Sequence, residues 1–185
     1  VYKGVIAMKE KINVFEKAPE ILENLRKGVL LTTKAGDRVN TMTIGWGTLG
    51  IEWAKPIFTV YVRQHRFTHE QLSKNPEFTV NVPVEAFNRS ILGKAGTLSG
   101  HDGDKIEKLG LTLEDPEVIS VPGIKELPLT LECRVLFQKE QKLSDLPKDI
   151  NDEFYPQNVD GTFHMANRDS HTAYYAEIVA AYIIK

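Results

Sequence analysis

The chain has 185 residues, 42% of them hydrophobic, which is enough for one well-packed core, so we expect a single domain over residues 1–185. Its 23 basic residues nearly balance 25 acidic ones, which argues against a nucleic-acid-binding or membrane-binding surface. The single cysteine, Cys133, cannot form an internal disulfide, and no apolar run reaches the roughly 18 residues of a membrane span. We therefore expect a cytoplasmic protein.

The first part of the chain predicts an arm, a helix and a hairpin. Residues 1–18 have no clean period and are expected to form an N-terminal arm. A helix is predicted to open at Pro19 and to end at Gly28. An apolar run at 29–33 and a stretch rich in Thr, Met, Ile and Trp at 39–46 flank a turn of small and polar residues, so they predict two antiparallel strands.

The rest of the chain predicts more strands separated by short elements. Alternating apolar residues predict strands at 56–63, 78–82, 129–138 and 172–184. Short helices are expected at 68–75, 85–92 and 104–109. Two loops are expected: a glycine-rich one that contains Gly93, Gly96, Gly100 and Gly103, and a proline-rich surface loop at 115–128.

This pattern predicts a mainly β fold with an antiparallel sheet and short helices. About six or seven strands are expected, and no long helices alternate with them. An antiparallel barrel is the natural architecture, because closure removes the exposed edges that so many strands would leave. An open sandwich is the alternative.

Anion-binding side chains follow the strand at 56–63. Arg63 alternates to the predicted polar face of that strand, and Arg66 follows it closely. Thr68 and Gln71 have the spacing of a capping box, which places a helix start between the strand and Gln71. Helix N–H groups, a hydroxyl and guanidinium groups at one place can bind a phosphate; the alternative is an ordinary charged surface.

Other residues have a functional and an ordinary interpretation. Trp46 and Trp53 flank a glycine-rich corner at Gly45, Gly47 and Gly50, and they could stack on a planar ring or lie in the core. Lys105 is either a second anion contact or a solvated lysine.

The sequence favours neither a metal site nor a protein nucleophile. His101, Asp102 and Asp104 match no ligand spacing, and His164 and His171 lack partners at such a spacing. Cys133 lies on the apolar face of its strand and is expected in the core. Any redox chemistry would therefore belong to a cofactor.

An ordered set of short motifs carries a family resemblance. The motifs are NTMTIGWG at 40–47, KP at 55–56, VYVR at 60–63 followed by Arg66 and Thr68, FTVNVP at 78–83, and LSG at 98–100 leading to DK at 104–105. Over roughly residues 20–137 this order resembles the flavin reductase-like family, including the flavoredoxins. The stretch 152–171, in a region that often shapes the substrate side in that family, matches no family pattern.

The resemblance implies an FMN-binding split β-barrel that forms a homodimer with the flavin near the subunit interface. It implies that the strand at 40–46 lines the isoalloxazine and ribityl chain through Asn40, Met42, Thr43, Ile44, Gly45 and Trp46. The phosphate would be held by Arg63, Arg66 and Thr68. The site would be closed by Ser99, Gly100 and Lys105.

The function that the resemblance implies is an NAD(P)H-dependent flavin reductase. FMN would carry the hydride, NADH or NADPH would be the reductant, and a small molecule or a flavin would be the acceptor. One alternative is a flavoredoxin-type electron carrier that receives electrons from a protein partner. Another alternative is a non-catalytic flavin-binding module.

Overall fold

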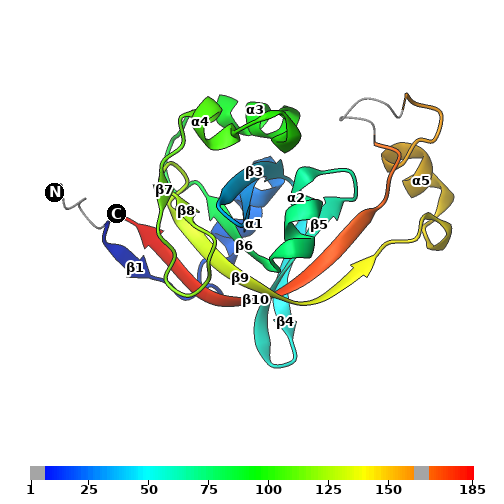
Figure 1. Ribbon diagram of the computed structural model, residues 1–185. Coiled ribbons are helices and arrows are strands. Elements are labelled where there is room, and N and C mark those ends of the chain that lie inside the picture. Colours follow the sequence, from blue (N-terminus) through cyan, green and yellow to red (C-terminus); the bar gives the residue numbers. More distant parts are fainter. Residues whose placement is uncertain (1–6, 161–166) are drawn as a thin grey trace.

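One antiparallel sheet dominates the fold (Figure 1), shown in a computed structural model that describes residues 7–160 and 167–185. Its hydrogen-bonded strand order is β3-β2-β6-β9-β10-β5-β4, and β1 pairs with the end of β10. The strands of this sheet are β1 (Lys9–Lys11), β2 (Val29–Ala35), β3 (Arg38–Ile44), β4 (Gly47–Glu52), β5 (Lys55–Arg63), β6 (Glu77–Val82), β9 (Leu129–Glu140) and β10 (His171–Ile184). The expected mainly β, antiparallel architecture is confirmed.

The sheet curls, but its hydrogen-bonded ladder does not close. Strands β3 and β4 lie at opposite ends of the strand order, and no β3–β4 pairing occurs in the described part of the chain. Ile44 nevertheless ends β3 only three residues before Gly47 begins β4. Three peptide units span at most about 11 Å, so the two edges of the sheet come together at this corner.

Two apolar clusters lie on the sheet. The larger cluster contains side chains of β2, β5, β6, β9 and β10, together with Ile21 and Leu25 from α1 (Ala18–Lys27). Cys133 is fully buried in it, as expected. The smaller cluster lies beneath α3 (Ser90–Thr97) and α4 (Lys105–Leu109), which lie together beside β3 in Figure 1.

The glycine-rich corner expected after β3 forms a further strand, β4, and a tight hairpin instead. Gly47 and Gly50 belong to β4, and the chain turns at Trp53 and Ala54, with φ angles of 51° and 56°. Two left-handed residues in a two-residue loop form the turn whose twist matches a β-hairpin. The sequence prediction was wrong here because neither residue is of the Asn or Gly type that usually marks this turn.

Two other predicted segments differ from the structure. Gly93 and Gly96 lie inside α3, because buried Leu92 and Ala95 give this helix a packed face that outweighs the low helix propensity of glycine. The expected surface loop at 115–128 is largely packed. It includes β8 (Gly123–Ile124), which pairs with β7 (Leu113–Glu114), and its buried apolar side chains are Ile119, Val121, Ile124 and Leu127.

The segment between β9 and β10 contains a 3-10 turn at Leu143–Asp145 and α5 (Lys148–Phe154). Figure 1 shows α5 at the end of the long β9–β10 pair that lies far from β1. Of the expected N-terminal arm, residues 9–11 form β1 and residues 1–6 lie outside the described part. None of the helices within residues 7–160 and 167–185 is both long and apolar enough to cross a membrane.

Candidate functional site

All twelve residues that the family resemblance implies for a cofactor line two adjoining hollows beside β3. The polar hollow, about 40 Å³, is lined by Asn40, Met42, His65, Arg66, Phe67, Thr68, Leu98, Ser99, Gly100, His101 and Lys105. The strand hollow, about 220 Å³, is lined by Met42, Thr43, Ile44, Gly45, Trp46, Tyr61, Arg63, Arg66 and His171. Met42 and Arg66 line both, so the two hollows form one continuous surface.

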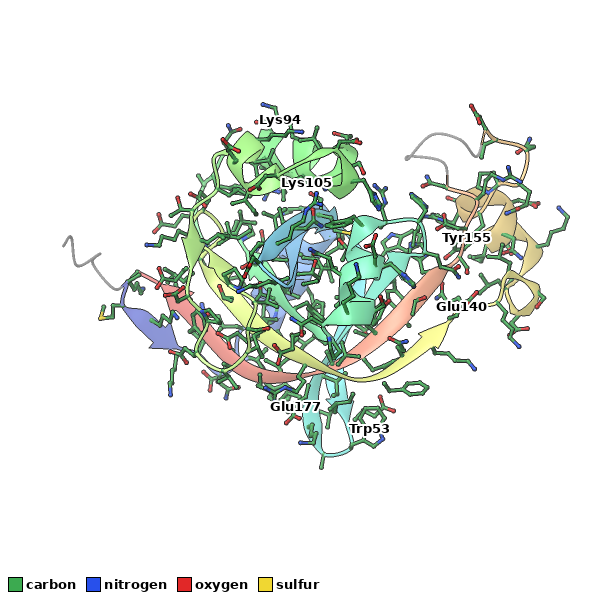
Figure 2. The ribbon with its side chains drawn as sticks, viewed as in Figure 1. Trp53, Lys94, Lys105, Glu140, Tyr155 and Glu177 are labelled. Carbon is green, nitrogen blue, oxygen red and sulfur yellow. The ribbon has the colours of Figure 1, made fainter. Side chains whose placement is uncertain are left out.

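Four elements build the polar hollow. Strand β3 contributes Asn40 and Met42, and Arg66 and Thr68 stand at the start of α2 (Phe67–Lys74). A 3-10 turn at Gly100–Asp102 follows α3, and α4 begins at Lys105, the residue labelled above β3 in Figure 2. A helix start, where backbone N–H groups lack helical partners, therefore faces the same space as two cationic side chains.

The helix start does not use the expected capping box. Arg66 is the N-cap residue, and no side chain caps the helix. Thr68 accepts a hydrogen bond at 3.1 Å from the Asn40 side-chain amide, while Gln71 donates to the Arg38 carbonyl at 2.9 Å. Gln71 is buried against β2 and β3 and cannot reach back to the N-cap, which is why the prediction was wrong.

Lys105 is buried rather than solvated. Its Nζ donates to the carbonyls of Thr41 at 3.0 Å and Ala95 at 2.9 Å. Burial, and then the charge of Arg66, lower the pKa of Lys105 to about 8. The pKa of Arg66 is also lowered, first by burial and then by Arg63. Each of these cations would be stabilised by an anion in the hollow.

The donor set of the hollows fits a phosphate group. No carboxylate occurs among the described residues that line either hollow, whereas two arginines and a lysine do. The hydroxyls of Thr68 and Ser99 add neutral hydrogen-bonding groups. Cationic groups and hydroxyls at a helix N-terminus are the chemistry that binds a phosphate, so the polar hollow can hold one.

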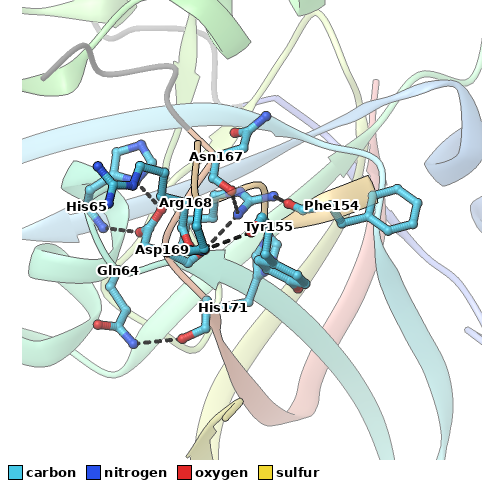
Figure 3. Close-up of polar contacts among 11 residues, drawn as sticks. Gln64, His65, Phe154, Tyr155, Asn167, Arg168, Asp169 and His171 are labelled. Carbon is cyan, nitrogen blue, oxygen red and sulfur yellow. Dashed lines mark hydrogen bonds and ion pairs between the residues drawn. The ribbon is translucent and has the colours of Figure 1, made fainter. Parts of the chain in front are cut away.

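The strand alternation predicted that Arg63 lies on a polar face of its strand, but the structure buries it. Both faces of β5 are largely buried, and Arg63 is 8% exposed. Its guanidinium donates to the carbonyls of Phe154 at 2.9 Å, Asn167 at 3.3 Å and Asp169 at 2.7 Å (Figure 3). Burial lowers the pKa of Arg63. The arginine thus fastens the segment between β9 and β10 to β5, and its role as a phosphate ligand stays a prediction.

A histidine and a tyrosine that the sequence did not place in the site stand beside Arg63. His171 lies opposite Arg63 in the register of β10 and β5, and its Nδ1 is 2.8 Å from the Tyr155 hydroxyl. Burial, and then the charge of Arg63, lower the pKa of His171 to about 4. Sequence spacing carries no signal for these contacts, because the pairing of β10 with β5 places His171 opposite Arg63, and the end of α5 places Tyr155 beside His171.

Trp46 is not in the core, and its stacking on a planar ring stays a prediction. It is 43% exposed and therefore not a core residue. Its ring centroid lies 5.0 Å from that of His171 and 5.2 Å from that of Phe154. Trp53 is also exposed and stands at the tip of the β4–β5 hairpin, away from the hollows (Figure 2).

A third space, the apolar pocket, adjoins the strand hollow. It has a volume of about 520 Å³ and is lined by Gly45, Trp46, Gly47, Tyr61, Gln141, Leu146, Ile150, Phe154 and Tyr155. Gly45, Trp46 and Tyr61 line both the apolar pocket and the strand hollow. The three spaces therefore lead from the cationic start of α2, past β3, to α5.

Side chains that the sequence analysis considered as metal ligands have other partners in the structure. Asp104 caps α4 by accepting from the backbone of Ile106 at 2.8 Å, and the His101 ring packs edge-on against Phe67. Within residues 7–160 and 167–185, no three His, Cys, Asp or Glu side chains lie close enough together to hold a metal ion. His164 lies outside the described residues.

A relative shares sequence with part of this chain. An uncharacterized protein of Archaeoglobus fulgidus is 36% identical over 104 residues, which are 56% of this chain and 58% of that protein. The match thus spans less than two thirds of that relative's length.

Solved structures with the same fold are similar over most of the chain. Flavoredoxin of Desulfovibrio vulgaris is 21% identical, with a TM-score of 0.63 over 85% of this chain and 69% of that one. An FMN-binding domain of a flavin reductases-like enzyme from Shewanella baltica is 17% identical, with a TM-score of 0.62 over 97% and 79% of the two chains. An NADH:FAD oxidoreductase of Streptomyces globisporus is 19% identical, with a TM-score of 0.59 over 83% and 74%.

The model of the flavin reductase like domain matches residues 25–185. The match includes β2 to β10 and every residue of the three spaces described above. This chain belongs to the flavin reductase-like family.

Proposed function

We propose that this protein is an FMN-binding oxidoreductase that uses NADH or NADPH as its reductant. One observation carries the proposal: the twelve residues expected at a cofactor line two hollows that share Met42 and Arg66. The polar hollow takes the FMN phosphate, and the strand hollow takes the ribityl chain and the ring. The FMN-binding neighbour from Shewanella baltica supports this choice of flavin.

The residues of the hollows divide the work of binding. Arg66 and Lys105 hold the phosphate charge, with Thr68 and Ser99 as hydrogen-bonding partners. Met42 and Ile44 of β3 give the ring an apolar surface, and the open backbone edge of β3 offers donors and acceptors to its polar edge. Bound FMN would supply the hydride and electron chemistry, and the protein supplies position and a charge environment.

A small-molecule reaction is favoured over the flavoredoxin-type electron carrier. The apolar pocket of about 520 Å³ adjoins the strand hollow, and an electron carrier that serves a protein partner does not need such a space. The NADH:FAD oxidoreductase with the same fold supports NADH or NADPH as the reductant. Steady-state oxidation of NADH or NADPH separates the two functions, since only the enzyme turns over without a protein partner.

The test of the flavin itself is a titration. We expect FMN fluorescence to be quenched saturably, and riboflavin to bind at least tenfold more weakly because it lacks the phosphate. Protein that leaves FMN fluorescence unchanged would remove the proposal. Equal binding of both flavins would remove only the assignment of the polar hollow.

We also propose a split barrel that pairs into a homodimer. The curled sheet, whose β3 and β4 edges meet at one corner, supports the barrel. Leu136 and Phe137 are 44% and 49% exposed, and Phe137 packs beside Tyr175, so β9 and β10 offer an apolar surface to a second copy. Light scattering should give the mass of two chains, and a monomeric mass with FMN bound would contradict the dimer.

A further inference from the structure

The apolar pocket has the size and the walls of a small-molecule site. Its volume of about 520 Å³ lies within the range of roughly 300–1,000 Å³ that is typical of ligand pockets. The corner between β3 and β4 forms one side of the pocket, and α5 with the residues around it forms the other. Its larger side chains are Trp46, Tyr61, Leu146, Ile150, Phe154 and Tyr155.

The lack of charged side chains in the pocket disfavours an anionic ligand. None of the described residues that line it is an aspartate, glutamate, lysine, arginine or histidine. Arg63, in the adjoining strand hollow, already donates to three backbone carbonyls and lies over the Tyr155 ring, 4.9 Å from its centroid. A carboxylate in the pocket would lose part of its hydration without gaining an ion pair, which is unfavourable.

The aromatic walls favour a flat ligand. The Trp46 and Phe154 rings meet nearly at right angles, with an interplanar angle of 81° and centroids 5.2 Å apart. A planar ring placed in such a corner can stack on one ring while it contacts the other edge-on. Because Trp46 also lines the strand hollow, this ligand would lie next to the space assigned to the flavin ring.

One side-chain amide in the pocket has a hydrogen-bond donor to offer. Gln141 accepts a hydrogen bond at 3.2 Å from the Tyr155 hydroxyl through its Oε1, and this contact orients the amide. In the described part of the chain, its NH₂ group has no hydrogen-bond acceptor. A ligand carbonyl oxygen is the group that such a donor would bind.

We infer that the apolar pocket binds an uncharged, planar ring compound with a carbonyl group, packed in the corner that Trp46 and Phe154 form and hydrogen-bonded to Gln141. That this compound is the acceptor in a reaction rests on the proposed function; that it binds does not, because the walls of the pocket are made of protein alone.

The test compares two probes of nearly the same shape, neutral benzamide and anionic benzoate. Trp53→Phe leaves Trp46 as the only tryptophan, so its fluorescence reports on the pocket without any flavin. We expect benzamide to change this fluorescence saturably and benzoate to bind at least tenfold more weakly at pH 7. Equal binding of the two probes, or no saturable change with benzamide in parent and variant by fluorescence and calorimetry, overturns the inference.

Two substitutions place the binding in the pocket. Gln141→Leu should weaken benzamide binding about five- to tenfold, the effect of one hydrogen bond, and Ile150→Asp should weaken it by about tenfold or more. Ile51→Asp is the matched control, since Ile51 is 72% exposed on β4 and does not line the pocket. If Ile150→Asp and Ile51→Asp lose the same amount of benzamide affinity, the assignment of binding to the apolar pocket is overturned.

FMN titrations of the same proteins distinguish the two proposals. Loss of FMN binding with benzamide binding intact would count against the proposed function alone.

Discussion

The Tyr155 hydroxyl lies 2.8 Å from Nδ1 of His171 and so connects the end of α5 to the first residue of β10. The lowered pKa of His171, about 4, means that its imidazole is neutral at pH 7. The hydroxyl has one proton, which it donates to Oε1 of Gln141, so Nδ1–H of the neutral imidazole donates to the hydroxyl oxygen. Protonation would place a charge on this buried ring beside Arg63, so the group is sensitive to pH below neutrality.

Stability should fall as the pH decreases from about 6.5 to 4. In this window the unfolded chain protonates His171 near its ordinary pKa of about 6.5, while the folded chain resists protonation down to about 4. Stability is thus fully present above pH 6.5 and is lost as the pH falls. We expect this group to contribute a loss of about 1 to 3 kcal/mol in urea unfolding. His171→Gln should flatten the profile in this window, whereas His101→Gln, at an exposed histidine, should not.

Arg66→Ala tests the phosphate end of the proposed flavin site. Loss of a charge-assisted hydrogen bond costs about 1.5 to 3 kcal/mol, so FMN affinity should fall roughly ten- to a hundredfold. Riboflavin should bind the variant as it binds the parent, because it has no phosphate. Arg26→Ala, at a largely exposed arginine on α1, is the control and should leave FMN affinity unchanged. If the variant loses FMN and riboflavin equally, Arg66 holds the ring rather than the phosphate.

Arg63 should stabilise the segment between β9 and β10 in its position against β5. Its three hydrogen bonds to the carbonyls of Phe154, Asn167 and Asp169 fasten this segment to β5. Arg63→Ala should therefore raise amide exchange in α5 and speed proteolysis near it, with little change in β2 or β6. Arg63→Lys should loosen the same segment, because a lysine lacks the planar fork that reaches three acceptors. Unchanged exchange in α5 would show that other contacts hold the segment.

Much of the fold and the candidate site follow from local sequence patterns. Apolar alternation along β9 and β10 marks long strands, because each residue of a strand faces the side opposite to its neighbours. The family resemblance that the short motif at 40–47 carries identifies residues of β3 and the following corner that line one or both of the hollows. These features are encoded within a few consecutive residues, so one sequence is enough to find them.

Features that depend on pairing between distant segments could not be predicted. His171 lies opposite Arg63 only because β10 pairs with β5, and the two are 108 positions apart in the chain. The burial of Arg63 likewise depends on α5 and its flanking residues. The turn at Trp53 was missed for a local reason, since a bulky residue with positive φ is rare in sequence statistics.

FMN binding should weaken as the pH rises through about 8. In the protein without FMN, Lys105 loses its charge near this pH, because burial and Arg66 lower its pKa. The phosphate stays a dianion from pH 7 to 9, so the lysine is the group that changes. We expect about a tenfold loss of affinity by pH 9, measured by FMN fluorescence. The Lys105→Met variant should bind FMN weakly at both pH 7 and pH 9, so its FMN affinity should not depend on pH in this range. If the affinity of this variant still falls as the pH rises, another group is responsible for the pH dependence.

Gly100→Ala tests the wall between the 3-10 turn and α2. A Cβ at this position would lie 2.5 Å from Cδ1 of Phe67 and 2.6 Å from Oδ1 of Asn40, closer than atoms can pack. Either the ring or the amide must move, so unfolding free energy should fall by about 1 to 3 kcal/mol. Gly93→Ala is the matched control: its Cβ would meet no atom within 4 Å, and alanine stabilises a helix by about 1 kcal/mol relative to glycine.

Because Asn40 donates to Thr68 across the polar hollow, Gly100→Ala should also weaken FMN binding. Normal stability and normal FMN affinity in Gly100→Ala would mean that Phe67 and Asn40 move aside without cost and that their positions are not critical to the site.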